Sequence, residues 1–575
     1  MKIKMVCLEG GITAYGFRKM AAFVERVNED TTTHYISTNV NRSVTNLILS
    51  RYGGLASEAM LDEMAEGLAD ADMIGFSSMT GYADLTKALI DKIRTKSRTP
   101  FIIWGGIHPI IHPEDAIEAD VDAICTGEGE FAFQEFFEGF REGKDFTGTP
   151  NFWFKRDGKT TRNSFLPLMS PEQMNTLPYA KYGENEQIYK SGKGFVPVTV
   201  SDYLESNGLA YNMVWSIGCP FHCTFCGNTK FIANDEKYKK IRHPSVQFIV
   251  GEVKEVLRKH PHVSTINFHD DSFLALPLKE ITEFSEAWRR EINVPFAVYG
   301  VIPNYVQEDK LAVLTWAGLN RIRMGIQSGS ARILEFYKRP TPVHRVEEAA
   351  QAISKFSKYQ IPPAFDIIVD NPLETRQDVI DTLELAYRLP RPYVFYIYSL
   401  RVIPNTVLEK QMKEAGIDLE QINAYYAVLH PSLANALLYL ITFWKPSRWL
   451  FDRMLKHVEA RQTPQTQYPT LVLALRSLYL LKRAYDHMRF MDFSVITGKV
   501  GYVFWRLGII SFWRRFLIPR MPSPTTGYAA QEPVQPADQG KRKVIQLKER
   551  SLQALAAVAT EASLNVVETA FIIVG

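Results

Sequence analysis

The stretch that decides the fold covers residues 216–228 and reads SIGCPFHCTFCGN. It places Cys219, Cys223 and Cys226 at the spacing C-x3-C-x2-C, directly after the apolar run of residues 212–219. Thiolates are the protein ligands of iron–sulfur clusters. Three cysteines leave one iron of a four-iron cluster open to a small molecule with an amine and a carboxylate. We therefore predict that these cysteines hold a 4Fe–4S cluster.

A structural zinc site is the alternative for the same loop. Zinc in such sites takes four protein ligands, and His222 would have to be the fourth. His222 lies inside the loop, where its ring would struggle to reach a metal that the three thiolates share. The spacing and the preceding strand favour the cluster.

The composition indicates an ordinary globular protein from a reducing compartment. The chain has 575 residues, a net charge of +3 and five cysteines. Cys7 and Cys125 lie alone in strand-like runs, so the odd count does not suggest a disulfide framework. The N-terminus has no signal-peptide pattern, and no apolar stretch reaches the roughly 18 residues of a membrane span. We predict a cytoplasmic protein that binds no nucleic acid.

Outward from the cysteines, residues 205–416 alternate between strand-like and helix-like patterns. The predicted strands are 212–219, 264–271, 295–302, 320–329, 364–370 and 393–403. Six strand–helix units predict a partial (β/α)6 barrel of the TIM type, with its site at the carboxyl ends of the strands.

Residues 1–145 predict a second α/β domain, a doubly wound, Rossmann-like parallel sheet. Its strands are expected at 3–9, 73–80, 101–106 and 123–130, and ligands bind beyond the carboxyl ends of such strands. Small or acidic residues at those ends form the candidate cofactor site: Ser77, Ser78, Gly105, Gly106, Gly127 and Glu128. Residues 146–204 are expected to be a linker with some structure of its own.

The remaining residues predict a helical, basic and aromatic region at 417–520, a disordered linker at 521–545 and a last helix or tail at 546–575. Residues 432–520 contain fourteen Lys or Arg and only four Asp or Glu. This pattern fits a helical cap that packs on the barrel, or an amphipathic surface that lies on an anionic membrane.

The cysteine loop and the strands around it resemble the radical S-adenosylmethionine (SAM) superfamily. The resemblance implies that Asp270 and Asp271, after the second strand, lie near the amino end of SAM. It also implies roles for Gln327 and Ser328 after the fourth strand and for Asp370 after the fifth. Gln327 stands where glutamate is common, and residues 403–406 resemble a Pro-Gly-Thr turn in which Asn405 replaces glycine. A structural turn is the alternative for each of these segments.

Residues 1–145 resemble the cobalamin-binding domain that precedes the barrel in one radical SAM group. The matching stretches are residues 75–80, 104–109 and 126–130. Residues 10–16 read GGITAYG, so the usual Asp-x-His-x-x-Gly loop is missing. If cobalamin binds, we expect no protein imidazole on its cobalt. A domain that has lost the cofactor is the alternative.

These resemblances imply an enzyme in which the cluster cleaves SAM to a 5′-deoxyadenosyl radical that abstracts hydrogen from substrate. The leading hypothesis is methylation of an unactivated carbon of a hydrophobic substrate, such as a membrane lipid or isoprenoid. Oxidative cyclisation of the anaerobic porphyrin-cyclase type and a non-catalytic cofactor-binding sensor are the alternatives. Flavodoxin or ferredoxin would donate the electron. The sequence assigns no catalytic acid or base.

Overall fold

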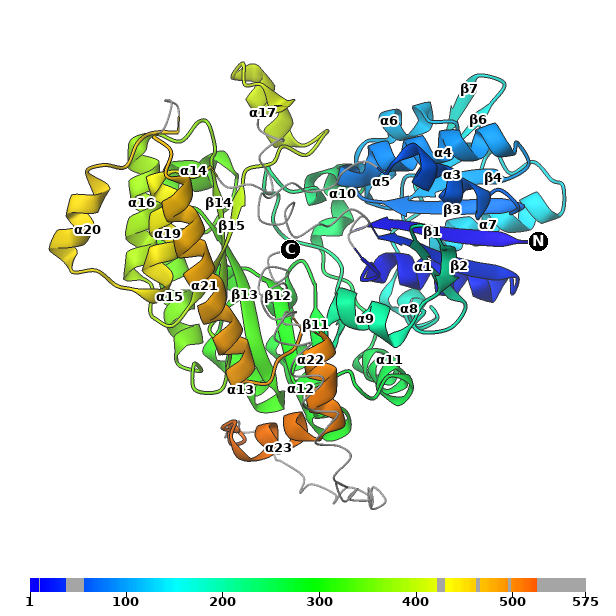
Figure 1. The fold of residues 1–575 in the computed structure, drawn as a ribbon. Coiled ribbons are helices and arrows are strands. Elements are labelled where there is room, and N and C mark those ends of the chain that lie inside the picture. The colour runs from blue at the N-terminus through cyan, green and yellow to red at the C-terminus, as the bar shows by residue number, and fades with distance from the viewer. Residues whose placement is uncertain (10, 38–55, 421–429, 462–465, 495–497, 525–575) are drawn as a thin grey trace.

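The computed structural model describes residues 1–9, 11–37, 56–420, 430–461, 466–494 and 498–524. Within these ranges the chain forms two sheets of mainly parallel strands and a C-terminal group of helices (Figure 1). The predicted linker and tail beyond residue 524 lie outside the described residues. No described helix is both long and apolar enough to span a bilayer.

The first sheet has the strand order β7-β6-β5-β4-β3-β1-β2-β8-β9. Its parallel centre consists of β1 Ile3–Glu9, β2 Thr31–Ser37, β3 Met73–Ser78, β4 Phe101–Gly105 and β5 Ala123–Cys125. Helices α1 Tyr15–Val27 and α7 Glu130–Arg141 pack on one face of the sheet. Helices α3 Glu58–Glu66, α4 Ala83–Lys96 and α6 Pro113–Glu118 pack on the other. The doubly wound prediction is confirmed.

Residues 146–204 complete this sheet instead of only linking it to the barrel. Strands β6 Phe152–Arg156 and β7 Lys159–Arg162 extend it beyond β5 in antiparallel pairing. On the other edge, β8 Glu186–Lys190 pairs parallel with β2, and β9 Gly194–Pro197 pairs with β8. Without these strands, β5 and β2 would expose unpaired backbone groups at both edges. The first sheet therefore includes strands as far along the sequence as Pro197.

The second sheet is a series of six parallel strands in sequence order. They are β10 Ala210–Met213, β11 Thr265–Phe268, β12 Phe296–Val301, β13 Leu319–Gln327, β14 Ala364–Val369 and β15 Val394–Ser399. The helices that cover it are α11 Val246–Lys259, α12 Leu278–Glu291, α13 Glu308–Ala317, α14 Ala331–Phe336, α15 Val343–Ser354 and α16 Arg376–Arg388. Shorter helices elsewhere are α5 Ile107–Ile111, α8 Pro171–Met174, α9 Val200–Asn207, α10 Asn228–Asn234 and α17 Val407–Glu414. The predicted partial barrel is confirmed.

The C-terminal helices pack against this partial barrel. They are α19 Leu433–Phe443, α20 Arg448–Leu455, α21 Pro469–Arg489, α22 Gly498–Arg506 and α23 Ile509–Phe516. From α21, the Tyr479 hydroxyl donates to the carbonyl of Phe395 on β15, one edge strand. Fourteen residues after Tyr479, the Phe493 carbonyl accepts from the amide of Leu209, next to β10, the other edge strand (3.0 Å). This segment bridges the two edges, as expected of a cap.

Candidate functional site

The three cysteines lie in the loop between β10 and α10, which opens at the carboxyl end of the barrel. Cys219 and Cys223 are buried and Cys226 is half-buried, and all three pack in one cluster with aromatic and aliphatic side chains. The other members of this cluster are Phe221, Phe225, Ile302 and Tyr305. The loop therefore places three free thiols together behind an apolar wall that shields them from water.

Asp270, the second residue after β11, fixes the start of this loop. Its carboxylate accepts from the backbone amides of Trp215 (2.9 Å) and Ser216 (2.7 Å) and from the Ser216 hydroxyl (2.6 Å). Burial raises the pKa of Asp270 to about 6, although these donors favour the charged form. Its three contacts make Asp270 a positioning residue for the cysteine loop. That it also contacts SAM stays a prediction.

Gly218 lets the loop turn tightly just before the first cysteine. Its φ is +116°, and a Cβ there would lie 2.6 Å from the Lys240 carbonyl oxygen and 2.8 Å from that of Tyr238. The Cys219 amide donates to the Tyr238 carbonyl (3.3 Å). Because a side chain cannot fit here, glycine is required at this position. Residues 238–240 thus form one wall of the loop.

Arg339 supplies a positive charge beside the Cys223 thiol. Its Nη1 lies 3.7 Å from the Cys223 Sγ, and its Nη2 donates to the Gly325 carbonyl. Burial raises the pKa of the Cys219 thiol to about 11 and that of Cys226 to about 12, so without metal these thiols are protonated. A bound metal cluster would convert them to thiolates.

The donor set fits a cluster better than a single ion. Among the described residues, no three His, Cys, Asp or Glu side chains are arranged to hold one metal ion. In an iron–sulfur cluster each thiolate binds a different iron, so the sulfur atoms need not converge on one point. Three cysteines behind an apolar wall fit that requirement.

Two predicted SAM contacts, Asp271 and Gln327, lie on the accessible side of this site. Asp271 is exposed, accepts from the Tyr238 hydroxyl (3.4 Å) and is close enough to Cys219 and Cys226 to raise their pKa values. Gln327 is half-buried at the end of β13 with φ +72°, a left-handed conformation that costs free energy. Both side chains remain candidates for contacts with SAM.

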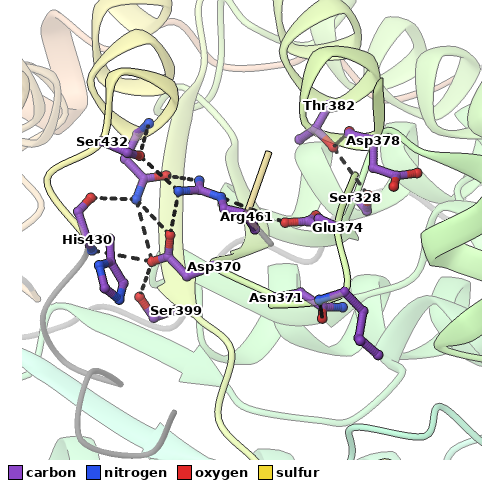
Figure 2. A network of polar contacts seen from close by, with 12 residues as sticks. Ser328, Asp370, Asn371, Glu374, Asp378, Thr382, Ser399, His430, Ser432 and Arg461 are labelled. Carbon is purple, nitrogen blue, oxygen red and sulfur yellow. Dashed lines mark hydrogen bonds and ion pairs between the residues drawn. The ribbon is translucent and has the colours of Figure 1, made fainter. Parts of the chain in front are cut away.

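Ser328 and Asp370, also predicted to contact SAM, are engaged inside the protein. The Ser328 hydroxyl is fully buried, lies 3.2 Å from that of Thr382 on α16 and accepts from the amide of Ser330. Figure 2 shows Asp370 at the centre of a network with the C-terminal region. Its carboxylate accepts from Ser399, from Asn435 (3.1 Å) and from Arg461 (2.9 Å). Neither contact pattern indicates a cofactor site.

The structure explains why asparagine can replace the glycine of a Pro-Gly-Thr turn at residue 405. Asn405 has φ +58°, in the left-handed region that glycine and asparagine tolerate best. Its side-chain amide donates to the carbonyl of Ile111 on α5 of the first domain (2.9 Å). Asparagine thus keeps the turn that glycine would give and adds a bond between the two domains.

In the first domain, the predicted small residues mostly serve the protein's own packing. A Cβ on Gly106 would lie 2.7 Å from the Ser77 hydroxyl, and one on Gly127 would lie 2.7 Å from Asn151. Gly105 meets only ordinary contacts, and the buried Ser78 accepts from the indole of Trp104 (3.0 Å). Gly106 and Gly127 are therefore explained without a ligand, while Gly105 and the half-buried Ser77 remain candidates.

Glu128, the last predicted residue of this set, ties the two domains together. Its carboxylate pairs with Arg242 (2.8 Å), which follows the wall of the cysteine loop, and accepts from the Met169 amide (2.7 Å). Helix α5 also contacts α10, directly after the cysteines. The N-terminus of β1 lies on the side of the domain away from the barrel (Figure 1). The carboxyl ends of the first sheet thus face the cysteine loop.

Two observations bear on cobalamin at this edge. Met79 and Ile107, which follow β3 and β4, are 47% and 37% exposed, so their apolar side chains are open to a bulky ligand at this edge. His108 is buried, stacks on Trp104 and contacts Asp115 through Nε2 (2.9 Å). The His108 ring is therefore engaged by other side chains of the first domain, and the absence of an imidazole ligand to cobalt stays a prediction.

The sequence reasoning missed the arginines of this site. Arg339 touches Cys223 from a point 116 residues later in the chain, and Arg461 reaches Asp370 across 91 residues. Neither lies in a motif that spacing could identify.

Comparisons with known proteins agree with this geometry. A family model of the B12 binding domain matches residues 7–137, and the model of the Radical SAM superfamily matches residues 213–386. These ranges coincide with the parallel centre of the first sheet and with the first five units of the barrel. The chain belongs to the radical SAM enzymes that carry an N-terminal B12-binding domain.

Individual relatives give the same assignment. An uncharacterized methyltransferase of Pyrococcus horikoshii is 26% identical over 456 residues, which cover 77% of this chain and 88% of the relative. The cytidylyl-2-hydroxyethylphosphonate methyltransferase of Streptomyces wedmorensis is 27% identical over 317 residues, 51% of this chain and 57% of that protein.

A solved structure shares the fold. TsrM, a radical SAM methyltransferase from Kitasatospora setae solved with cobalamin and a 4Fe–4S cluster, is 17% identical with a TM-score of 0.55. The match covers 72% of this chain and 75% of TsrM.

Proposed function

We propose that this enzyme transfers a methyl group to an unactivated carbon of a small-molecule substrate, with a 4Fe–4S cluster, SAM and cobalamin as cofactors. One observation carries the proposal: the cysteine loop at the mouth of the barrel faces the carboxyl edge of a B12-type sheet. The methyltransferase relatives support it. When bound, the cluster and SAM supply the one-electron chemistry and cobalamin carries the methyl group.

The chain's own residues position these groups and exclude water. Cys219, Cys223 and Cys226 hold the cluster, Asp270 orders their loop, and Arg339 places a positive charge beside the thiolates. Asp271 and Gln327 face the open side, where we assign them to the amino end and the ribose of SAM. Met79, Ile107, Ser77 and Gly105 would hold cobalamin at the carboxyl edge of the first sheet.

The electron donor and the membrane contact belong to the same proposal. The cluster needs an external one-electron donor, for which we propose flavodoxin or ferredoxin. A peripheral membrane contact is supported by exposed aromatic side chains on the C-terminal helices: Trp449 (69%), Phe512 (59%) and Phe516 (63%). Two basic residues of this region, Arg461 and Arg483, are buried and do not contribute to such a contact.

Anaerobic reconstitution with iron, sulfide and cobalamin, followed by product analysis, tests the proposal. We expect S-adenosylhomocysteine and a methylated product from a panel of candidate substrates. Cys223→Ala should lose the cluster and all SAM cleavage, while the matched change Cys125→Ala, at a buried cysteine on β5, should keep both.

The products also separate the alternatives. 5′-Deoxyadenosine with an oxidised, unmethylated product would indicate a cyclase. Intact cofactors with no SAM cleavage under reducing conditions would indicate a sensor. Cobalamin that washes out at saturating supply would contradict the role of the first domain.

A further inference from the structure

The interior of the barrel carries an arginine–tyrosine cluster that the sequence motifs did not predict. It consists of Arg321, Arg323, Arg483, Tyr299, Tyr396 and Tyr398. Along β13, Arg321 and Arg323 alternate with Ile322 and Met324, which belong to the hydrophobic core between sheet and helices. Because successive side chains of a strand point to opposite faces, the two arginines point into the barrel.

The cluster holds more positive than negative charge. Arg321 pairs with Asp492 (3.0 Å) and Arg323 with Asp366 (2.7 Å). Within the described residues, Arg483 pairs with no carboxylate, although it is only 7% exposed. Its Nη2 donates to the Tyr396 hydroxyl, and its Nε has no hydrogen bond. A buried charge without a counterion is costly, so an anion here would be stabilising.

Tyr396 brings two of these guanidinium groups close together. Its ring centre lies 4.4 Å from the guanidinium carbon of Arg323 and 4.3 Å from that of Arg483. The Tyr398 hydroxyl accepts from Arg323 (2.6 Å). Cation–π contacts of this kind stabilise the arginines without neutralising them. The excess charge therefore remains available to a ligand.

The cluster can be reached from the mouth of the barrel. The Arg323 side chain is 25% exposed, and the exposed His269 stacks on Tyr299 with ring centres 4.4 Å apart. Between Arg323 and Gln327, the inward position of β13 is Gly325, where a Cβ would lie 2.6 Å from the Gln327 Nε2 and 3.2 Å from the Arg339 Nη2, so these two side chains cover the glycine. At about 3.3 Å per residue, Arg323 lies about 13 Å along the strand from Gln327. That separation is comparable to the length of a small molecule.

We propose that this cluster binds an acidic group of the substrate, a carboxylate or phosphoryl anion, with Arg323 as the first contact. The inference rests on the proposed function and names the substrate class: a molecule whose anionic end lies deep in the barrel and whose reacting carbon lies near the mouth. A wholly apolar lipid or isoprenoid would leave the excess charge uncompensated. The substrate is therefore an acid.

Anion binding to the reconstituted full chain tests the inference directly. Inorganic phosphate and acetate are titrated by calorimetry at constant ionic strength, in saturating SAM so that the open iron is covered. We expect one of the two anions to bind, and Arg323→Gln to weaken it at least ten-fold. The control variant Arg258→Gln, at an exposed arginine on α11, should bind the anion as tightly as the unchanged protein does. Preference for phosphate would indicate a phosphoryl group on the substrate, and preference for acetate would indicate a carboxylate.

Three outcomes would overturn the inference. Neither anion binds the unchanged protein at concentrations up to roughly 1 mM, the upper end of ordinary KM values, or Arg323→Gln binds the anion as tightly as the unchanged protein does, or the anion binds only when SAM is left out. The last result would assign the arginines to the SAM carboxylate. If Arg323→Gln does not fold, the double change Arg323→Gln/Asp366→Asn removes the pair together. Binding is measured without turnover, so a missing methylated product would contradict only the proposed function.

Discussion

Asp270 and Asp370 follow two strands of the same barrel, β11 and β14, yet they anchor different parts of the molecule. Asp270 accepts from two backbone amides and a hydroxyl in residues 215–216, at the start of the cysteine loop. Asp370 accepts from side chains of the C-terminal region, chiefly Asn435 and Arg461. The first carboxylate orders the cofactor loop and the second holds the cap.

The difference shows how a carboxylate at a strand end can serve structure rather than ligand binding. At both positions the carboxylate oxygens of a nearly buried side chain accept hydrogen bonds from other groups of the protein. The exposed neighbour Asp271 is the better candidate for SAM. Exposure, more than position at the strand end, separates the binding candidates from the positioning residues.

The largest expected effect is at Asp270. Asp270→Ala leaves two buried amides without an acceptor, at roughly 1–3 kcal/mol each, and should release the start of the cysteine loop. We expect reconstituted iron and sulfide per chain to fall at least five-fold, measured by colorimetric assay and visible absorbance. Asp370→Ala should keep its iron.

Two further variants of the contact between Asp270 and Ser216 serve as controls. Ser216→Ala removes one hydroxyl donor and should keep most of the iron, and Asp270→Asn, which retains one acceptor, should fall between. Full iron content in a folded Asp270→Ala protein would contradict the positioning role.

The next effect is at Arg461. Arg461→Ala leaves Asp370 buried without its cation, which typically costs about 3–5 kcal/mol. We expect amide exchange in α19 to become at least ten-fold faster, measured by hydrogen–deuterium exchange, while iron content is kept.

Arg453→Ala, at an exposed arginine on α20, is the matched control and should leave exchange in α19 unchanged. Unaltered exchange in the Arg461→Ala protein would show that α19 is held by its apolar contacts alone.

The architecture was largely predictable because parallel strands buried on both faces are nearly continuous apolar runs. Five of the six barrel strands lie within their predicted segments or within one residue of them; β10 ends at Met213, because residues 214–219 turn away to form the loop. Strand β2 was missed since its sequence, TTTHYIS, is polar although β-branched. The strands of residues 146–204 were missed because they are only four or five residues long and lie at or next to the edges of the sheet.

Some residues of the site belong to a local sequence motif, and others are brought together from distant parts of the chain. The cysteines could be predicted as cluster ligands because all three lie within eight consecutive residues. Arg321 bonds Asp492 across 171 residues and Arg483 bonds Tyr396 across 87. Such pairs depend on how the C-terminal region folds over the barrel, which no local pattern records.

The smallest effect concerns the pH dependence of the cap. Glu374 lies beside the network of Figure 2, where burial raises its pKa to about 8; Arg461 opposes this shift, and Asp370 and Asp378 reinforce it. Because the folded state then binds a proton that the unfolded state has released, stability should fall as pH rises from about 4.5 to 8 and level off above. Glu374→Gln stays neutral and should lose this part of the pH dependence.

Melting temperatures at pH 5 and pH 9 measure the effect. We expect the difference between Glu374→Gln and the unchanged protein to shift in favour of the variant by about 1–3 °C from pH 5 to pH 9. Glu286→Gln, at an exposed glutamate on α12, should show no such shift. A shift in the opposite direction would mean that Glu374 is ionised and pairs with Arg461, since their closest nitrogen–oxygen distance of 4.0 Å allows that pairing. The arginine would then serve both carboxylates, and the cap would be most stable at high pH.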